Sequence, residues 1–388
     1  MDNLRIIFLY SYLFLLPIEN WSPWGGPTDL FRPALIMAFG YIGLSFFKFR
    51  NFRISSLKAY LSPIFYLWFC LLVSSIIFFI NYPSVDLTLN FTFIICVVSF
   101  WLLSNDLRKY PKLYFNFIVV VVLNGFFISL LSFFGIGIDV GYMGRESLLG
   151  NNANIIGLNV IFSFFSILYL IIENPMNISS KRYLLLLLFP FLVQTIARTG
   201  SKGALLLLMI GLFVYFTFLN KPIKFKVPIF VLGILGSLFV YSTLLENSVL
   251  SERWENFIEE GNTTGRTERW FFAWNIFLNN PLIGVGENGI EFIPSPFVGL
   301  NEPHNVYLYV LACGGIIGFF FLSLFLFRLC KNVFINYLSN KSLLPVVFLI
   351  LVLMHWFKAG GGLNSKIIWI YFAFILHSGY KNRFAINY

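Results

Sequence analysis

The chain has 388 residues, of which 58% are hydrophobic and 20% aromatic, while only 11% are charged. A soluble domain cannot bury that much apolar surface, so the composition predicts a polytopic membrane protein. The net charge of +10 does not indicate a nucleic-acid partner, because the basic residues form short clusters between apolar runs. The four cysteines lie in or beside apolar runs without metal-ligand spacing, and no disulfide framework is expected.

Twelve apolar runs follow one another along the chain, and each is predicted to cross the membrane as a helix. Their approximate bounds are 4–16, 33–47, 59–80, 87–103, 113–134, 155–172, 183–196, 204–219, 227–245, 306–327, 343–357 and 367–376. The predicted fold class is therefore an all-α polytopic membrane protein in which residues 1–388 form a single integral membrane domain. The longest hydrophilic segment, residues 246–303, is predicted to be a large loop that carries part of an active site.

The distribution of basic residues predicts the orientation. With the N-terminus inside the cell, the loops on the inner face carry 18 Lys and Arg with 3 acids, whereas the outer face carries 9 with 14 acids. Positive residues concentrate in cytoplasmic loops, so both termini are expected in the cytoplasm and residues 246–303 outside.

No Asp, Glu, Lys or Arg is expected inside a span, which argues against a lipid-linked oligosaccharide flippase or another transporter, since such proteins carry ionisable groups along their path. The polar side chains gather instead on the predicted outer face, at Arg145, Asn151–Asn154, Arg198–Lys202, Arg266–Arg269 and Glu302–Asn305. A site at the membrane surface suits a lipid-linked substrate, whose head group lies in water and whose tail lies in the bilayer.

Arg198 follows an apolar run and precedes Ser201 and Lys202. Arginines at the end of a span often reach to the lipid headgroups as anchors. The alternative is a phosphate-binding turn, because a guanidinium group binds phosphate oxygens at two points and a nearby hydroxyl adds a donor. The sequence leaves both interpretations open.

Arg266 and Arg269 begin a segment in which Trp270, Trp274 and Phe277 recur at helical spacing. One interpretation is an amphipathic helix that lies on the membrane with its arginines toward lipid phosphates. The other keeps that helix and turns one arginine toward a pyrophosphate group of the substrate. The two interpretations are compatible.

His304 is a candidate general base, because its unperturbed pKa near 6.5 lets it take a proton near neutral pH. Glu302 and Asn305 flank it, and a glycine-rich apolar run follows. No HExxH or other metal-binding pattern is present, so no metal is expected. The glycines of GVGENG do not indicate a nucleotide site, because no strand-turn-helix context accompanies them.

Five motifs occur in a set order: Arg-Thr-Gly-Ser-Lys-Gly at 198–203, Gly-Arg-Thr-Glu-Arg-Trp at 265–270, Pro-Leu-Ile-Gly-Val-Gly at 281–286, His-Asn-Val-Tyr-Leu at 304–308, and Gly-Gly-Ile-Ile-Gly at 314–318. In this order and topology the chain resembles the bacterial O-antigen ligase / O-antigen polymerase superfamily. The motifs cover the second half of the chain, and the span count and loop position extend the likeness to the whole of it.

The resemblance implies a metal-independent, inverting glycosyltransferase of the GT-C type, without a cofactor, at the periplasmic face of the bacterial inner membrane. Its donor is a glycan on undecaprenyl pyrophosphate, and its surroundings include the bilayer and a chain-length regulator. A ligase transfers the glycan to lipid A-core, whereas a polymerase transfers it to another lipid-linked repeat unit.

The resemblance also implies site residues. Arg198, Arg266 and His304 match the catalytic positions of the family. The neighbouring residues predicted to bind substrate are Arg269, Lys202, Ser201, Arg145, Asn305 and Glu302. Two departures are visible: Lys202 stands where an arginine is common, and Arg269 has no family counterpart.

Polymerase is the leading prediction, because polymerases vary with each glycan serotype and therefore make up more of the superfamily. Ligase is the alternative within the same class. A flippase and a non-catalytic envelope scaffold are alternatives of other classes, and the scaffold would leave the arginines and His304 unexplained.

Overall fold

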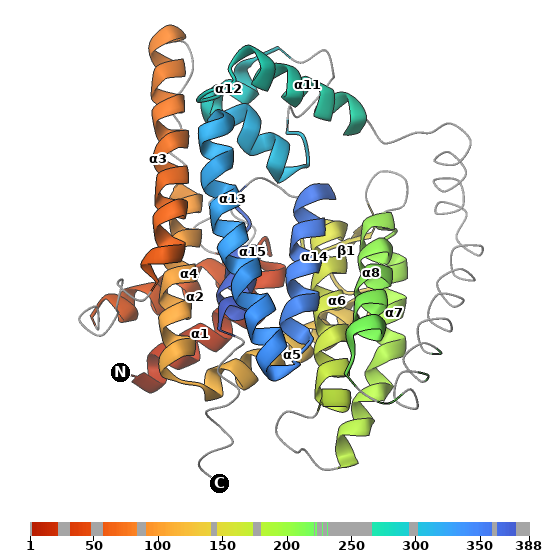
Figure 1. The fold of residues 1–388 in the computed structure, drawn as a ribbon. Coiled ribbons are helices and arrows are strands. Elements are labelled where there is room, and N and C mark those ends of the chain that lie inside the picture. The colour runs from red at the N-terminus through yellow and green to blue at the C-terminus, as the bar shows by residue number, and fades with distance from the viewer. Residues whose placement is uncertain are drawn as a thin grey trace.

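The structure is a computed structural model that describes residues 2–21, 32–47, 57–83, 91–140, 146–173, 180–220, 222, 227, 231, 266–294, 302–358 and 363–377. Most of these residues are helical, and the helices form a bundle (Figure 1). Arg145, most of the predicted span at 227–245 and much of the predicted loop at 246–303 lie outside the described residues.

The described helices, in chain order, are α1 (Asp2–Leu15), α2 (Pro33–Phe46), α3 (Lys58–Asn81), α4 (Phe91–Lys109), α5 (Lys112–Phe134), α6 (Ala153–Leu168), α7 (Phe189–Arg198), α8 (Lys202–Phe218), α11 (Arg266–Asn279), α12 (Gly286–Phe292), α13 (Val306–Asn340), α14 (Leu344–Lys358) and α15 (Lys366–Leu376). Short 3₁₀ segments cover Leu16–Ile18 and Ser180–Leu188, and a π turn covers Tyr169–Glu173. Strands β1 (Ile138–Val140) and β2 (Glu146–Leu148) pair antiparallel, with Ile138 opposite Leu148.

Five helical segments are long and apolar enough to cross a membrane: α3, α4, α5, α6 with its π turn, and α13. Five shorter apolar helical segments, which include α2, α8, α14 and α15, accompany them in the described part of the chain. This composition is consistent with the predicted all-α membrane protein. The count of twelve spans and the position of the large loop stay predictions.

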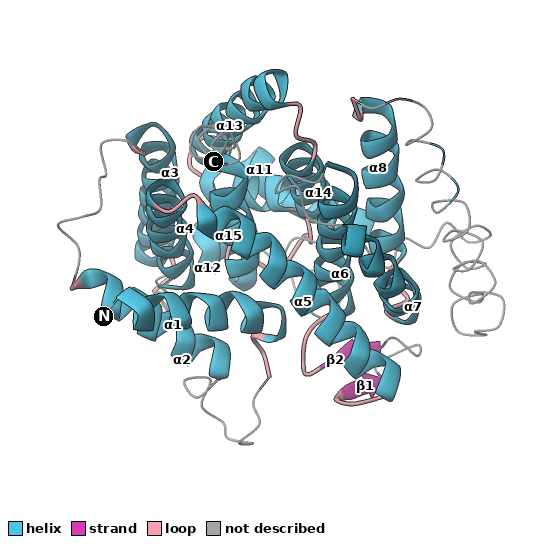
Figure 2. Cartoon of the chain, turned by 90° about the horizontal axis from the view of Figure 1, so that it is seen from below, coloured by secondary structure: helices cyan, strands magenta, loops and turns pink. Residues whose placement is uncertain are grey.

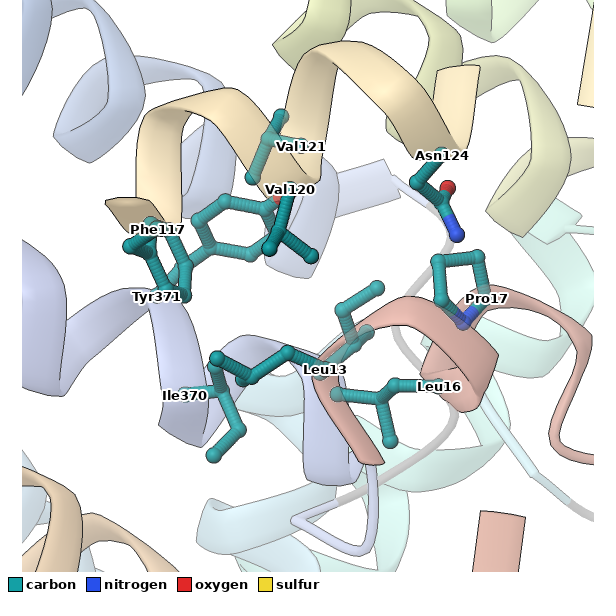
Figure 3. A pocket seen from close by; sticks show the side chains of 10 residues that line it. Leu13, Leu16, Pro17, Phe117, Val120, Val121, Asn124, Ile370 and Tyr371 are labelled. Atoms are coloured by element: carbon teal, nitrogen blue, oxygen red, sulfur yellow. The ribbon is translucent and has the colours of Figure 1, made fainter. Parts of the chain in front are cut away.

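The centre of the bundle is α15, in which every residue from Ile367 to Leu376 is buried. A helix that is apolar on all sides must be covered on all sides. It packs against α4, and α14 and α13 also contact it, as the view from below shows (Figure 2). A small cavity lies between α15, α1 and α5, and Asn124 is among the aliphatic and aromatic side chains that line it (Figure 3). The Asn124 amide donates to the Phe14 carbonyl, so this cavity is a packing gap rather than a polar site.

Helices α11 and α12 lie across one end of the bundle, where α3 and α13 reach them (Figure 1). They are held there by backbone contacts with α13. The backbone N–H of Val285 donates to the Ala312 carbonyl at 3.0 Å, and that of Ile316 donates to the Pro281 carbonyl at 2.9 Å. The turn at 281–286 thus replaces hydrogen bonds that α13 loses where its backbone breaks at Gly315.

Two glycines make this close approach possible, and we call the contact between the 281–286 turn and the break in α13 the glycine seam. Gly315 has a φ of 58°, and a Cβ there would lie 2.3 Å from the Leu282 carbonyl oxygen. A Cβ on Gly284 would lie 2.4 Å from the Cys313 carbonyl carbon. Any side chain would force the two backbones apart. The seam therefore explains why PLIGVG and GGIIG occur together in one sequence.

Helix α3 fixes the seam from the other side. The Ser74 hydroxyl donates to the Ile283 carbonyl, and the backbone N–H of Glu287 donates to Ser75 Oγ at 3.2 Å. These contacts satisfy backbone groups of a turn that could not otherwise be buried. As a result, the 281–286 turn, which follows α11 closely, is held by α13 on one side and by α3 on the other.

The expectation that no ionisable residue lies inside a span is wrong. Asp106 lies within α4, one of the helices long and apolar enough to cross a membrane, and Arg5 lies within α1 and within the predicted span at 4–16. Both are buried, and Arg5 Nη1 lies 2.6 Å from Asp106 Oδ2. The Tyr41 hydroxyl donates to the same oxygen at 2.7 Å. Burial of the two charges is tolerated because each is paired and hydrogen-bonded.

Candidate active site

The turn at 198–202 joins the end of α7 to the start of α8. Gly200 has a φ of 56°, which allows the reversal, and Ser201 caps α8 by accepting from a backbone N–H of its first turn at 3.1 Å. The Ser201 hydroxyl in turn donates to Asn154 Oδ1 at 2.7 Å. Both hydrogen bonds of the Ser201 hydroxyl stabilise this turn, and they hold Lys202 at the positive end of the α8 helix dipole.

Arg198 is the last residue of α7. Its guanidinium donates to the carbonyl of Ser132, near the end of α5, and it lines a small pocket together with Leu148, Thr195 and Thr199. Among the described residues, no contact links Arg198 to Arg266 or His304. The structure therefore places Arg198 beside the β-hairpin, separately from the residues of α11.

Helix α11 presents two different faces. Arg266, Arg269 and Trp270 share one face, because residues three and four apart are neighbours on a helix. Phe271 and Leu278 lie on the other and are 66% and 56% exposed. Aromatic and aliphatic side chains on such a face suit the headgroup region of a bilayer. The arginine face is the one that approaches the end of α13.

Trp270 joins the arginine face of α11 to two other segments of the chain. Its indole Nε1 donates to the Pro303 carbonyl at 2.9 Å. Its ring lies 5.3 Å from the ring of Phe357, near the end of α14. One side chain therefore connects α11, the residue before His304 and α14. Sequence reasoning treated Trp270 only as part of an aromatic helix face, although the Gly-Arg-Thr-Glu-Arg-Trp motif contains it.

His304 lies directly before α13 in a conformation that is uncommon for a residue with a side chain. Its φ is 50°, in the left-handed region. The following residue, Asn305, is buried and caps α13, since its Oδ1 accepts from the N–H groups of Tyr307 and Leu308 at 3.0 and 3.1 Å. His304 is thus held between Pro303, whose carbonyl accepts from Trp270, and the capped start of α13.

His304 and Glu302 both lie within electrostatic range of Arg269, and His304 is also within range of Arg266. Burial lowers the pKa of His304 from 6.5, and the positive charges of Arg269 and Arg266 lower it further. Burial and the nearby Glu291 raise the pKa of Glu302, while Arg269 partly offsets that increase. His304 is therefore a neutral imidazole near pH 7, and Glu302 is a more basic carboxylate than usual.

Lys358, the last residue of α14, joins this group. It follows the apolar stretch that ends at Phe357, and the pKa of its ammonium group is lowered to about 8 by burial and by the charges of Arg266 and Lys202. We call Lys202, Arg266, Arg269 and Lys358 the cation cluster. Sequence reasoning missed Lys358, which could have been noticed only as a basic residue that ends a span on the predicted outer face.

The structure thus brings together most of the predicted site residues and separates others. Lys202, Arg266, Arg269, Glu302 and His304 meet at the α11 end of the bundle. Ser201 and Asn305 serve as helix caps there, Arg198 lies in its own pocket, and Arg145 is outside the described residues. Within the described ranges no three His, Cys, Asp or Glu side chains are grouped so as to hold a metal ion. Metal independence stays a prediction.

A helical membrane protein with cations and a histidine gathered beside a helix that exposes an apolar face can bind an anionic group carried by a lipid. Comparison with known families agrees with this class: a family described as O-antigen ligase matches residues 184–323. This match supports membership of the O-antigen ligase/polymerase superfamily, whose members are glycosyltransferase-like enzymes, and it confirms the resemblance predicted from the sequence. Neither a curated protein nor a solved structure matches the chain.

Proposed function

We propose that the chain is a metal-independent, inverting glycosyltransferase of the GT-C type that takes its glycan from undecaprenyl pyrophosphate. The observation that carries the proposal is the cation cluster, which lies next to His304 and beside the exposed apolar face of α11. A pyrophosphate group on a lipid matches both features, because its charge suits the cations and its tail suits the bilayer.

The chemistry needs a stabilised leaving group and a base. As the bond between the anomeric carbon and the pyrophosphate oxygen breaks, its electrons pass to that oxygen, and fixed guanidinium groups stabilise the developing charge. Arg266 is proposed for this role because Trp270, on the same face of α11, contacts Pro303 and Phe357. Arg198 is proposed as a second contact because it matches the family motif. The acceptor hydroxyl attacks the opposite face of the anomeric carbon and forms the new glycosidic bond while it gives up its proton.

His304 is the proposed base for that proton. Its lowered pKa keeps the imidazole neutral at pH 7, so it is able to accept. Glu302 is the alternative, because its raised pKa makes it a stronger base than an ordinary carboxylate. Glu287 is less suitable, since it already accepts from the Tyr309 hydroxyl at 3.0 Å.

Within this class we propose an O-antigen polymerase, which joins lipid-linked repeat units, and we expect a chain-length regulator as its partner. Ligase is the second candidate, because the matching family carries that description. Deletion of the gene followed by gel analysis of lipopolysaccharide separates the two. Core that carries a single repeat identifies a lost polymerase. Bare core with accumulating long lipid-linked polymer identifies a lost ligase, and an unchanged pattern contradicts both.

The proposed orientation places both termini in the cytoplasm and the site at the periplasmic face of the inner membrane, on the asymmetry of basic residues. In a variant without native cysteines, a membrane-impermeant thiol reagent should label Asn262→Cys from outside but not Asn51→Cys. The opposite pattern would place the site in the cytoplasm and contradict the lipid-linked donor.

A further inference from the structure

The side chain of Lys358 lies across the first turn of α8. If Gly203 carried a Cβ, that atom would be 2.9 Å from Lys358 Nζ and 2.8 Å from its Cε. The hydroxyl of Ser201 lies 3.4 Å from the same point. The absence of a side chain at position 203 thus makes the space in which the ammonium group rests, next to the N-terminus of α8.

Lys358 is brought close to other cations without a counter-charge of its own. Arg266 from α11 and Lys202 from α8 both act on it electrostatically. In the described part of the chain, Lys358 makes no hydrogen bond or ion pair. Lys358 of α14 therefore lies near the positive charges of Arg266 from α11 and Lys202 from the N-terminus of α8, and both of these charges repel its ammonium group.

We propose that Lys358 is a further binding residue for the pyrophosphate group of the donor, and that it holds this group together with Arg266 and Lys202. The inference rests on the proposed function. It assigns a role to a residue that lies outside the matched range of 184–323. Lys358 contributes a point charge at the end of a flexible stem, whereas the guanidinium of Arg266 contributes a planar pair of donors.

The test measures binding of geranylgeranyl pyrophosphate, a short-chain prenyl pyrophosphate, to the purified full-length chain in detergent. Geranylgeraniol and inorganic pyrophosphate are the comparison ligands. Lys358→Gln removes the charge, and Lys358→Arg keeps it. Lys331→Gln is the matched control, because Lys331 is exposed on α13 and is not part of the cation cluster.

Lys358→Gln should weaken binding of the pyrophosphate probe about tenfold, since a lost charge-assisted contact has that magnitude. Lys358→Arg should restore it to within about threefold, and Lys331→Gln should bind as the wild type does. The melting temperature of ligand-free Lys358→Gln should equal or exceed that of the wild type, because a repelled cation has been removed. A purely structural lysine would show the reverse: lower melting temperature and unchanged affinity.

Gly203→Ala is a second, independent variant. Its methyl group would displace the end of the Lys358 side chain, which is flexible and can move away. We expect weaker probe binding in a protein that remains folded, with an effect smaller than that of Lys358→Gln. Normal binding in both variants would overturn the assignment of Lys358.

Arg266→Gln separates that failure from failure of the proposed function. If Arg266→Gln loses the probe while Lys358→Gln binds normally, Lys358 is not a ligand contact and the glycosyltransferase proposal stands. If the wild type binds geranylgeranyl pyrophosphate no better than geranylgeraniol, both proposals fail. Equal, Lys358-dependent binding of inorganic pyrophosphate would assign the site to a soluble anion and overturn the lipid-linked donor.

Discussion

Two groups of charged residues in this molecule are built in opposite ways. In the first, Arg5 of α1 meets Asp106 of α4 and Tyr41 of α2, so the positive charge has its counter-charge within the chain. In the second, Lys358, Arg266 and Lys202 come from three helices and act on one another as like charges. The first group joins helices, whereas the second places repelling groups side by side.

The difference indicates what each group is for. A buried, neutralised pair stabilises a particular packing of helices and needs nothing from outside. A buried cation near like charges, as Lys358 is, costs folding free energy, and proteins keep such a cost where function requires it. Removing the charge of Lys358 is therefore expected to weaken ligand binding without lowering stability, whereas breaking the Arg5–Asp106 pair is expected to lower stability without changing ligand binding.

The largest expected effect comes from breaking the neutralised pair. Asp106→Ala leaves Arg5 buried without its carboxylate and should reduce the free energy of unfolding by about 3–5 kcal/mol. Thermal melting in detergent and the amount of protein in the membrane measure this. The turnover per folded molecule should stay normal. Loss of turnover in protein that melts like the wild type would give the pair a catalytic role. It would then contradict the conclusion that this pair only stabilises helix packing.

The next effect concerns His304. His304→Gln keeps hydrogen bonding but cannot take the proton, so turnover should fall about 100-fold or more with normal donor binding. Because the pKa of His304 is lowered, the wild-type rate should fall only below pH 6.5, as the ring becomes protonated.

That acid limb should disappear in His304→Gln. If the limb persists there and disappears instead in Glu302→Gln, then Glu302 is the base and His304 positions the acceptor. Near-normal turnover of His304→Gln at every pH would remove the imidazole from the proton transfer altogether.

A smaller effect compares two arginines that the structure separates. Arg266→Lys replaces a planar fork with a point charge and should lower donor affinity and turnover about tenfold or more, with little change in melting temperature. Arg198→Lys should lower both activity and melting temperature, because Arg198 also holds the end of α5 through the Ser132 carbonyl. If Arg198→Lys loses stability but keeps full activity, Arg198 is only a structural residue.

The sequence predicts the helical membrane class and the superfamily, because apolar runs and ordered motifs are local signals. It also predicts that Arg266 and His304 are part of one site, although they are 38 positions apart in the sequence. It does not predict the glycine seam, since nothing local in the sequence shows that Gly284 approaches the carbonyl of Cys313 in another helix.

Other features were missed for the same reason. Lys358 becomes interesting only when α14 brings it beside Gly203 and Arg266. The Arg5–Asp106 pair was missed because a charge inside a span can be recognised as tolerated only when its partner is seen. Ser201 and Asn305 were predicted to bind substrate, although Ser and Asn directly before an apolar run are also typical N-cap residues, and both cap helices in the structure.

The smallest expected effect is the pH dependence of the free energy of unfolding, which tests whether Lys358 carries an unneutralised charge. The pKa of this lysine is lowered in the folded protein, from 10.5 to about 8, so between these values the unfolded chain binds more protons than the folded one. Stability therefore rises with pH in this window, and below pH 8 the full cost of the repelled charge is present. Solvent screening should keep this gain to about 1 kcal/mol.

Thermal melting of the ligand-free protein between pH 7 and 10 measures the gain, and Lys358→Gln should lack it while Lys331→Gln keeps it. Geranylgeranyl pyrophosphate should also abolish the rise, because a bound anion raises the pKa of Lys358 toward its ordinary value. A rise that survives in Lys358→Gln belongs to another group. If the rise in stability persists when the protein is saturated with the probe, the anion does not reach Lys358. The cation cluster would then have no bound anion to set it apart from the paired charges of Arg5 and Asp106.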